Sequence, residues 1–198
     1  GVEEFSAEAV AQGLLHASLR GIDSHGIRLF PHYLRGLKGG RINHKPKFIF
    51  NKTSISTGKL DGDHSFGHAA GVEGMNKAIE IAADAGSGHV AVYNSSHFGA
   101  AAFFALIAAK RDMIGMCFTN ATPHVLTSGG KRAFFGNNPI CFVAPCEGEE
   151  PFCLDMATSA ITFNRVLQHK ESNAPIPADS VADANGNPTT DPDSAKYL

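Results

Sequence analysis

Two histidines lie where an imidazole could exchange a proton with a small ligand. His25 is part of the run DSHG, and His97 is part of the run SSHFG. Histidine is the side chain best suited to proton transfer near neutral pH. A neighbouring serine can orient the ring through a hydrogen bond, and a neighbouring glycine leaves room for a ligand. The two runs therefore indicate an enzyme that acts on a small molecule.

The sequence around His25 predicts a connection between two helices. Ser24 can hydrogen-bond an imidazole nitrogen and select its tautomer. Arg28 and Tyr33 follow on the second helix, and arginine is the natural bidentate partner of a carboxylate. An alternative interpretation is a helix start, capped by Asp23 or Ser24, with no chemical role.

His97 follows a short apolar strand, HVAVY, and precedes a helix of small residues. A strand, a polar loop and a helix in this order place backbone N–H groups beside a ligand. The alanines at 100–102 leave space for a flat ring or a phosphate. The alternative is a capped helix with a structural histidine.

The elements that hold these loops are predicted from hydrophobic periodicity and from glycine and proline positions. Helices are expected over 6–20, 27–38, 69–85 and 100–110, and strands over 47–60, 89–93, 113–120, 133–144 and 152–156. Residues from Ser172 onward are expected to form a surface loop. The change from helices to alternating strands and helices predicts two domains. No G-x-G-x-x-G follows a strand, so a Rossmann fingerprint is absent.

Composition excludes several classes of protein. Apolar residues make up 43% of the 198 residues, which is enough for a packed core, and the net charge is -2 with scattered cations. These values favour neither nucleic acid nor a membrane as partner, and no apolar run approaches the ~18 residues of a membrane span. The four cysteines form no C-x-x-C pair and indicate reduced thiols in the cytoplasm. His64 and His68 have metal-ligand spacing but lack an acidic third ligand, so no metal is expected.

Six motifs in order together resemble one family. They are DSHGIRLFPHYLRGL, NSSHFGAA, TNATP, GNNPICFVAP, LDMATSA and DANGNPTTDP. The chain resembles the malate/L-lactate dehydrogenase family, whose members reduce 2-keto acids or cyclic imino acids with NADH or NADPH. The resemblance implies an α+β fold that is not a Rossmann fold. It consists of a small helical domain and a mixed, largely antiparallel sheet domain flanked by helices.

The resemblance also implies a domain division and a partner. Residues 1–50 would be the helical part of a substrate and dimerisation domain, and residues 51–198 an incomplete cofactor-binding α/β sandwich domain. Family chains are longer than this one, so whether residues 1–198 suffice for activity stays open. Members usually form homodimers, and this chain is expected to do so.

Roles follow from the resemblance position by position. His25 would donate the proton in reduction, with Ser24 orienting it, although His97 is taken as the base in some members. The expected cofactor contacts are His97, Phe98, Gly99, Ala100, Ala101, Asn120, Ala121, Asp155, Met156 and Ala157. The expected substrate contacts are Arg28, Tyr33 and Asn137.

Two departures affect the carboxylate site. Many relatives carry arginine where this chain has Leu29, so Arg28 is expected to substitute for it. The usual Gly-Thr-Asn-Pro is Gly-Asn-Asn-Pro here, which places Asn137 where relatives have a hydroxyl.

The expected activity is an NAD- or NADP-dependent 2-hydroxyacid dehydrogenase, with malate or lactate as substrate. Two alternatives stay open: a cyclic imino acid reductase acting on piperideine-2-carboxylate, and a truncated relative that binds ligands without catalysis.

Overall fold

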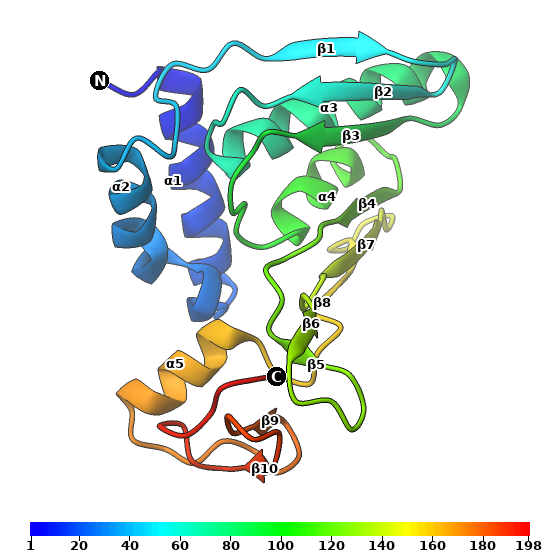
Figure 1. The fold of residues 1–198 in the computed structure, drawn as a ribbon. Helices are drawn as coiled ribbons and strands as arrows, with labels where there is room; N and C mark the ends of the chain where they lie inside the picture. Colours follow the sequence, from blue (N-terminus) through cyan, green and yellow to red (C-terminus); the bar gives the residue numbers. More distant parts are fainter. The chain divides into compact units, whose positions relative to one another are not determined.

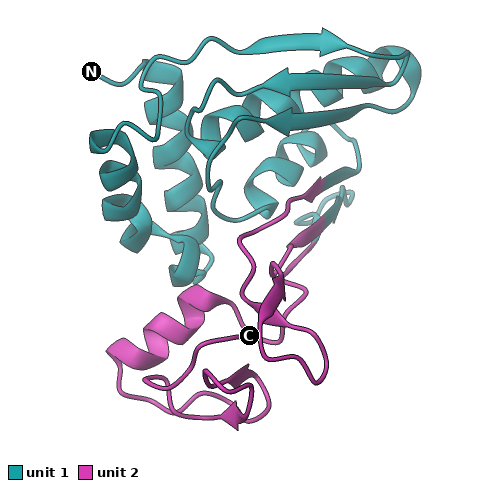
Figure 2. Cartoon of the chain, in the orientation of Figure 1, with its two compact units in different colours: residues 1–116, 142–153 teal, residues 117–141, 154–198 magenta.

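The computed structural model describes residues 1–198 as an α+β fold (Figure 1). It has two compact units, residues 1–116 with 142–153, and residues 117–141 with 154–198 (Figure 2). No helix combines the length and the hydropathy needed to cross a membrane. The assignment of residues 1–50 to a substrate and dimerisation domain stays a prediction.

The first unit begins with a helical layer. Helix α1 (Glu4–Leu19) leads through two 3-10 turns, η1 (Asp23–His25) and η2 (Ile27–Leu29), into α2 (Phe30–Lys38). The buried residues of this layer form one apolar cluster, which consists of Ala9, Val10, Leu14, Tyr33, Ile42, Phe66 and Ala69. Burial of these side chains is the main force that holds α1 against α2 and the start of the next helix.

A three-stranded sheet follows. Strand β1 (Ile49–Lys52) pairs antiparallel with β2 (Thr57–Asp61), and β2 pairs parallel with β3 (His89–Tyr93). The parallel pair requires a crossover, which α3 (Gly67–Ala85) provides while it packs along one face of the sheet (Figure 1). Helix α4 (Ala102–Ala109) packs against α3 and is almost wholly buried. The β3–α4 connection carries His97.

Three further strands form a second sheet, in the order β4, β7, β8. They are β4 (Gly115–Phe118), β7 (Ile140–Ala144) and β8 (Phe152–Met156). The division between the two units falls within each of these strands.

The second unit contains short elements. Strands β5 (Val125–Leu126) and β6 (Ala133–Phe135) pair antiparallel, as do β9 (Val181–Ala182) and β10 (Pro188–Thr189). Helix α5 (Phe163–Glu171) packs its one buried residue, Val166, against Ile176 and Val181.

The structure corrects four details of the predicted elements. The strand predicted over 133–144 is two strands, β6 and β7, which belong to different sheets. The second helix begins at Phe30 rather than 27, because Pro31 stands in its first turn, where the missing N–H is not needed. The sequence did not predict helix α5, which begins after Thr162. The Thr162 Oγ1 atom caps this helix by accepting a hydrogen bond from Arg165 N. The tail from Ser172 is not only a loop, since it contributes Ile176 and Val181 to a small core.

Candidate active site

Ser24 and His25 form a hydrogen-bonded pair in η1. The chain turns after α1, where Ile22 N donates to Ala17 O at 2.9 Å, and this turn places η1 beside the helical layer. Ser24 Oγ lies 3.0 Å from His25 Nδ1, and both residues are half-buried. With Nδ1 engaged by the serine hydroxyl, the ring orientation of His25 is restricted.

His97 is held by a tyrosine from a different element. Tyr33, on α2, is 1% exposed, and its hydroxyl lies 2.7 Å from His97 Nδ1. Burial raises the pKa of Tyr33, so the hydroxyl stays neutral. His97 itself keeps an accessible surface. The pair joins residues 64 positions apart, and it leaves His97 Nε2 as the nitrogen available to a ligand.

The two predicted catalytic histidines lie together. Their rings stack with centroids 5.8 Å apart and planes 17° apart, and His32 meets His97 edge-on at 6.1 Å. Loss of solvent around the imidazole, and then positive charge on His25, His32 and Arg41, lowers the pKa of His97 to about 4. His97 is therefore neutral at pH 7.

His68 lies behind this pair at the start of α3. It is fully buried, and neither of its ring nitrogens has a hydrogen-bond partner. Its ring meets the ring of Tyr33 edge-on at 5.1 Å. Burial, with smaller effects of charge on His97 and His25, lowers the pKa of His68 to about 3. The side chain is thus a neutral imidazole inside the fold.

The segment from His97 to Ala101 forms a tight, small-residue connection. Gly99 has φ +76°, a left-handed conformation that favours glycine. Phe98 stacks on Phe104 at 5.0 Å, and Ala100 and Ala101 are buried. Helix α4 then begins without a side-chain cap. Uncapped N–H groups next to small residues suit an anionic ligand group.

Arginines supply positive charge around the histidines. Arg28 is half-buried on η2, close in sequence to His25. Arg41 packs its guanidinium over Gly36, where a Cβ atom would lie 2.6 Å from Nη2. Burial and the charges of Arg41 and Arg35 lower the pKa of His32.

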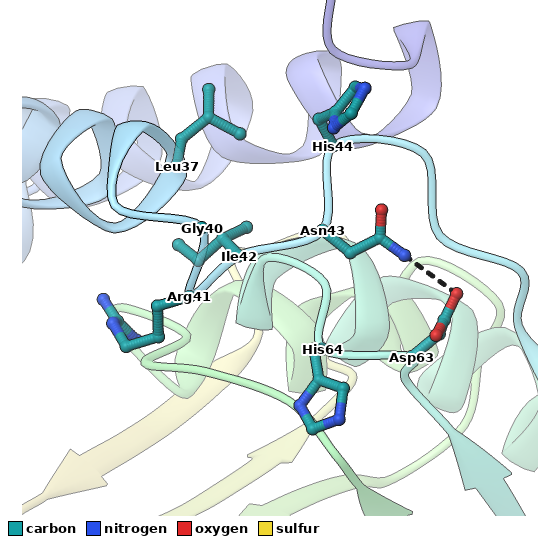
Figure 3. Close-up of a pocket in the computed structure, with 8 residues that line it drawn as sticks. All are labelled: Leu37, Gly40, Arg41, Ile42, Asn43, His44, Asp63 and His64. Carbon is teal, nitrogen blue, oxygen red and sulfur yellow. Dashed lines mark hydrogen bonds between the residues drawn. The ribbon is translucent and has the colours of Figure 1, made fainter.

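Arg41 also lines a pocket of about 570 Å³ between the α2–β1 and β2–α3 connections (Figure 3). Asn43 Nδ2 donates to Asp63 Oδ2 at 2.9 Å across this pocket (Figure 3). None of the predicted site residues lines it.

Two asparagines of the second unit, which is magenta in Figure 2, connect the motifs that contain the remaining predicted residues. Ala121 N donates to Asn138 Oδ1 at 3.0 Å, and Thr158 N donates to Asn137 O at 2.8 Å. These bonds bring together the three motifs that contain the rest of the predicted contacts, which are Asn120, Ala121, Asn137, Asp155, Met156 and Ala157.

Asp155 also influences a neighbouring thiol. Burial, and then the charge of Asp155, raise the pKa of Cys117 to about 12. None of the four cysteines forms a disulfide, and no group of three or more His, Cys, Asp or Glu residues is arranged to hold a metal.

Sequence reasoning missed three residues of the histidine cluster: His32, Arg41 and His68. His32 precedes Tyr33 in the first motif, so its position near the predicted site could have been inferred from the sequence. His68 was weighed only as a metal ligand with His64, and the structure instead buries it while His64 is exposed. The small-residue run around it, GHAAG, was the available signal for close packing.

Comparison with solved structures defines the fold class. Malate dehydrogenase from Entamoeba histolytica superimposes with a TM-score of 0.93 at 36% identity, over 98% of this chain and 54% of that one. Δ1-piperideine-2-carboxylate reductase from Pseudomonas syringae pvar. tomato gives a TM-score of 0.92 at 29% identity, over 98% of this chain and 58% of that one. The chain therefore shares its fold with a malate dehydrogenase and with a cyclic imino acid reductase.

The sequence defines the family. Residues 1–197 match the model of the malate/L-lactate dehydrogenase family. The malate/(S)-sulfolactate dehydrogenase of Methanothermus fervidus is 38% identical over a region that covers 98% of this chain and 57% of that protein. The chain belongs to the malate/L-lactate dehydrogenase family. It spans about half the length of the curated relatives that it matches.

Proposed function

We propose that the full-length protein is a nicotinamide-dependent 2-hydroxyacid dehydrogenase that interconverts a small 2-keto acid, malate or lactate in type, and its 2-hydroxy acid. Membership of the malate/L-lactate dehydrogenase family supports the reaction class. Similarity to a malate/(S)-sulfolactate dehydrogenase and to a malate dehydrogenase supports an acid of the malate type. The stacked pair of His25 and His97, each with a hydroxyl on Nδ1, is the observation that carries the proposal.

His25 is the proposed proton carrier. Reduction of a keto acid needs a proton at the C2 oxygen, and oxidation removes it. With a pKa of about 4, His97 holds almost no proton at pH 7 and would be a poor donor. His25, with Ser24 Oγ on Nδ1, would exchange the proton at Nε2.

His97 has a supporting part in this proposal. A neutral His97 avoids placing two charged rings face to face, since like charges at 5.8 Å would disfavour protonation of His25. Its Nε2 would hydrogen-bond the substrate, while Tyr33 fixes the ring from the other side.

The carboxylate of the substrate requires a cation. Arg28 is the proposed anchor, because its fork of donors matches a carboxylate. Tyr33 and Asn137 are the other proposed substrate-side residues, and Tyr33 acts through its bond to His97.

NAD or NADP is the proposed cofactor. When bound, it would supply the hydride that moves between nicotinamide C4 and substrate C2. The residues present fit such a group: Ala100 and Ala101 are small, and α4 offers uncapped N–H groups. The proposed contacts are His97, Phe98, Gly99, Ala100, Ala101, Asn120, Ala121, Asp155, Met156 and Ala157.

We further propose a homodimer in the cytoplasm. The resemblance to the family supports the dimer, and four cysteines without a disulfide suit a reducing compartment. A second candidate function is reduction of a cyclic imino acid, which the similarity to a Δ1-piperideine-2-carboxylate reductase favours.

The test is oxidation of NADH and NADPH by the full-length protein, with a panel of 2-keto acids and piperideine-2-carboxylate. Turnover of oxaloacetate, pyruvate or sulfopyruvate is the expected result, and turnover of only the imino acid would favour the second candidate. No turnover with any of them, together with measurable NADH binding, would support a non-catalytic relative.

A further inference from the structure

His68 is the one buried polar group in the histidine cluster that the proposed reaction does not use. It is fully buried, and both ring nitrogens lack a partner. An unsatisfied polar atom inside a protein destabilises the fold, and an apolar side chain at the same place would avoid that cost. Departures of this kind concentrate at functional sites.

The ring of His68 occupies space that two glycines leave for it. A Cβ atom at Gly13, on α1, would lie 2.3 Å from its Cδ2, and a Cβ atom at Gly99 would lie 2.6 Å from its Nε2. Both distances are far shorter than any side chain tolerates. The ring is therefore enclosed by α1 on one side and by the connection that starts at His97 on another.

Tyr33 closes the enclosure. Its ring meets His68 edge-on at 5.1 Å and Phe66 edge-on at 6.4 Å, while its hydroxyl reaches His97 Nδ1 at 2.7 Å. Tyr33 is almost fully buried, so its position depends on these ring contacts. A smaller side chain at 68 would leave a cavity against both Tyr33 and Gly99.

We propose that His68 is a positioning residue: its ring fixes Tyr33 and the connection after His97, and so keeps the Tyr33 hydroxyl on Nδ1 of His97. His68 affects catalysis only through Tyr33 and His97, so the catalytic part of this proposal rests on the proposed function. Its geometric part, the fixed Tyr33–His97 pair, is testable without turnover.

The consequence concerns where the proton goes. The groups that face His97 are Tyr33 and the charges of His25, His32 and Arg41, and those that face His68 are Tyr33, His97 and His25. When water enters beside Tyr33, the charged form of His97 is better solvated and its pKa rises toward the ordinary 6.5. His97 then competes with His25 for the proton.

The experiment is NMR titration of isotopically labelled histidines in the full-length protein, with and without His68→Ala. We expect His97 to titrate near pH 4 in the parent and about one pH unit or more higher in the variant. His68→Gln, which refills most of the cavity with a neutral polar group, restores the parent value. His89→Ala, an exposed histidine on β3, is the matched control and leaves His97 unchanged.

Kinetics give the second readout. In His68→Ala we expect kcat to fall about tenfold with KM for the reduced nicotinamide nearly unchanged, because positioning is lost and cofactor contacts remain. A His97 titration and a kcat that both match the parent, with only stability reduced, would overturn the proposal. If His68→Ala does not fold, His68→Asn takes its place, and an unchanged His97 titration in that variant overturns it equally. Absence of dehydrogenase turnover would count against the proposed function and would leave the titration result intact.

Discussion

The enclosure of His68 predicts an unusual response to Gly13→Ala. Gly13 lies in the middle of α1, where alanine normally stabilises a helix by about 0.5–1 kcal/mol. Here the new methyl group would lie 2.3 Å from His68 Cδ2. Overpacking of a filled core costs about 1–3 kcal/mol, and the ring has no room to retreat because Gly99 and Tyr33 enclose it. The variant should therefore be about 1–2 kcal/mol less stable than the parent.

The sign should reverse when the ring is absent. In a His68→Ala background the methyl group enters an open cavity, so Gly13→Ala should stabilise by about 1 kcal/mol. The difference between the two backgrounds gives a coupling energy of about 2–3 kcal/mol, which is large for a pair with no polar contact. Ala11→Gly, on the exposed face of α1, measures the helix-propensity effect by itself and should cost about 1 kcal/mol.

The assay is urea unfolding of the parent, the two single variants and the double variant at pH 7.5, with equal m values as the condition for comparison. Stabilisation of the parent by Gly13→Ala would show that His68 does not fill the space beside Gly13. Additive effects in the double variant would show the same.

Three more predictions concern the histidine cluster. Tyr33→Phe should destabilise the protein by about 1–3 kcal/mol, because it leaves His97 Nδ1 without its partner, and kcat should fall with it. The pKa of His68 is lowered in the folded state, so its contribution to stability is complete above pH 6.5 and is lost as pH falls toward 3. The free energy of unfolding in urea should therefore change less steeply with pH between pH 6 and 4 in His68→Gln than in the parent, by about 1.4 kcal/mol per pH unit. Arg41→Met should raise the pKa of His32, because a positive charge that disfavours its protonation is removed, and histidine NMR at low salt measures this.

A different experimental result would contradict each of these three predictions. Tyr33→Phe with parental stability and kcat would show that the hydroxyl bond is not formed in solution. Equal pH slopes for the parent and His68→Gln would show that His68 is not held neutral by burial. An unchanged His32 titration would place the Arg41 guanidinium away from the cluster.

Regular elements with clear periodicity were predictable from the sequence. The predicted strand 89–93 coincides with β3, and the predicted helix 69–85 extends only two residues further at its start, as Gly67–Ala85. The helix has apolar residues at helical spacing and ends at Gly86, whereas the strand is a short continuous apolar run. The motif match also indicated the family, which the sequence comparison shows.

Other features depend on tertiary contacts that a local pattern does not contain. Helix α5 spans only nine residues and is polar overall with a single buried residue, Val166, so its short apolar stripe is easily overlooked in the sequence. The bond between Tyr33 and His97 spans 64 positions and arises only when α2 and the β3–α4 connection meet. The burial of His68 depends on Gly13 and Gly99, which are distant from it in sequence.

The proton role of His25 is tested most directly by steady-state reduction of a 2-keto acid by the full-length protein carrying His25→Gln, with NADH affinity measured separately by calorimetry. Loss of a positioned acid lowers kcat about a hundredfold or more. We expect that loss with NADH affinity unchanged, while His89→Gln behaves like the parent. Retention of kcat in His25→Gln, together with its loss in His97→Gln, would instead assign the proton to His97.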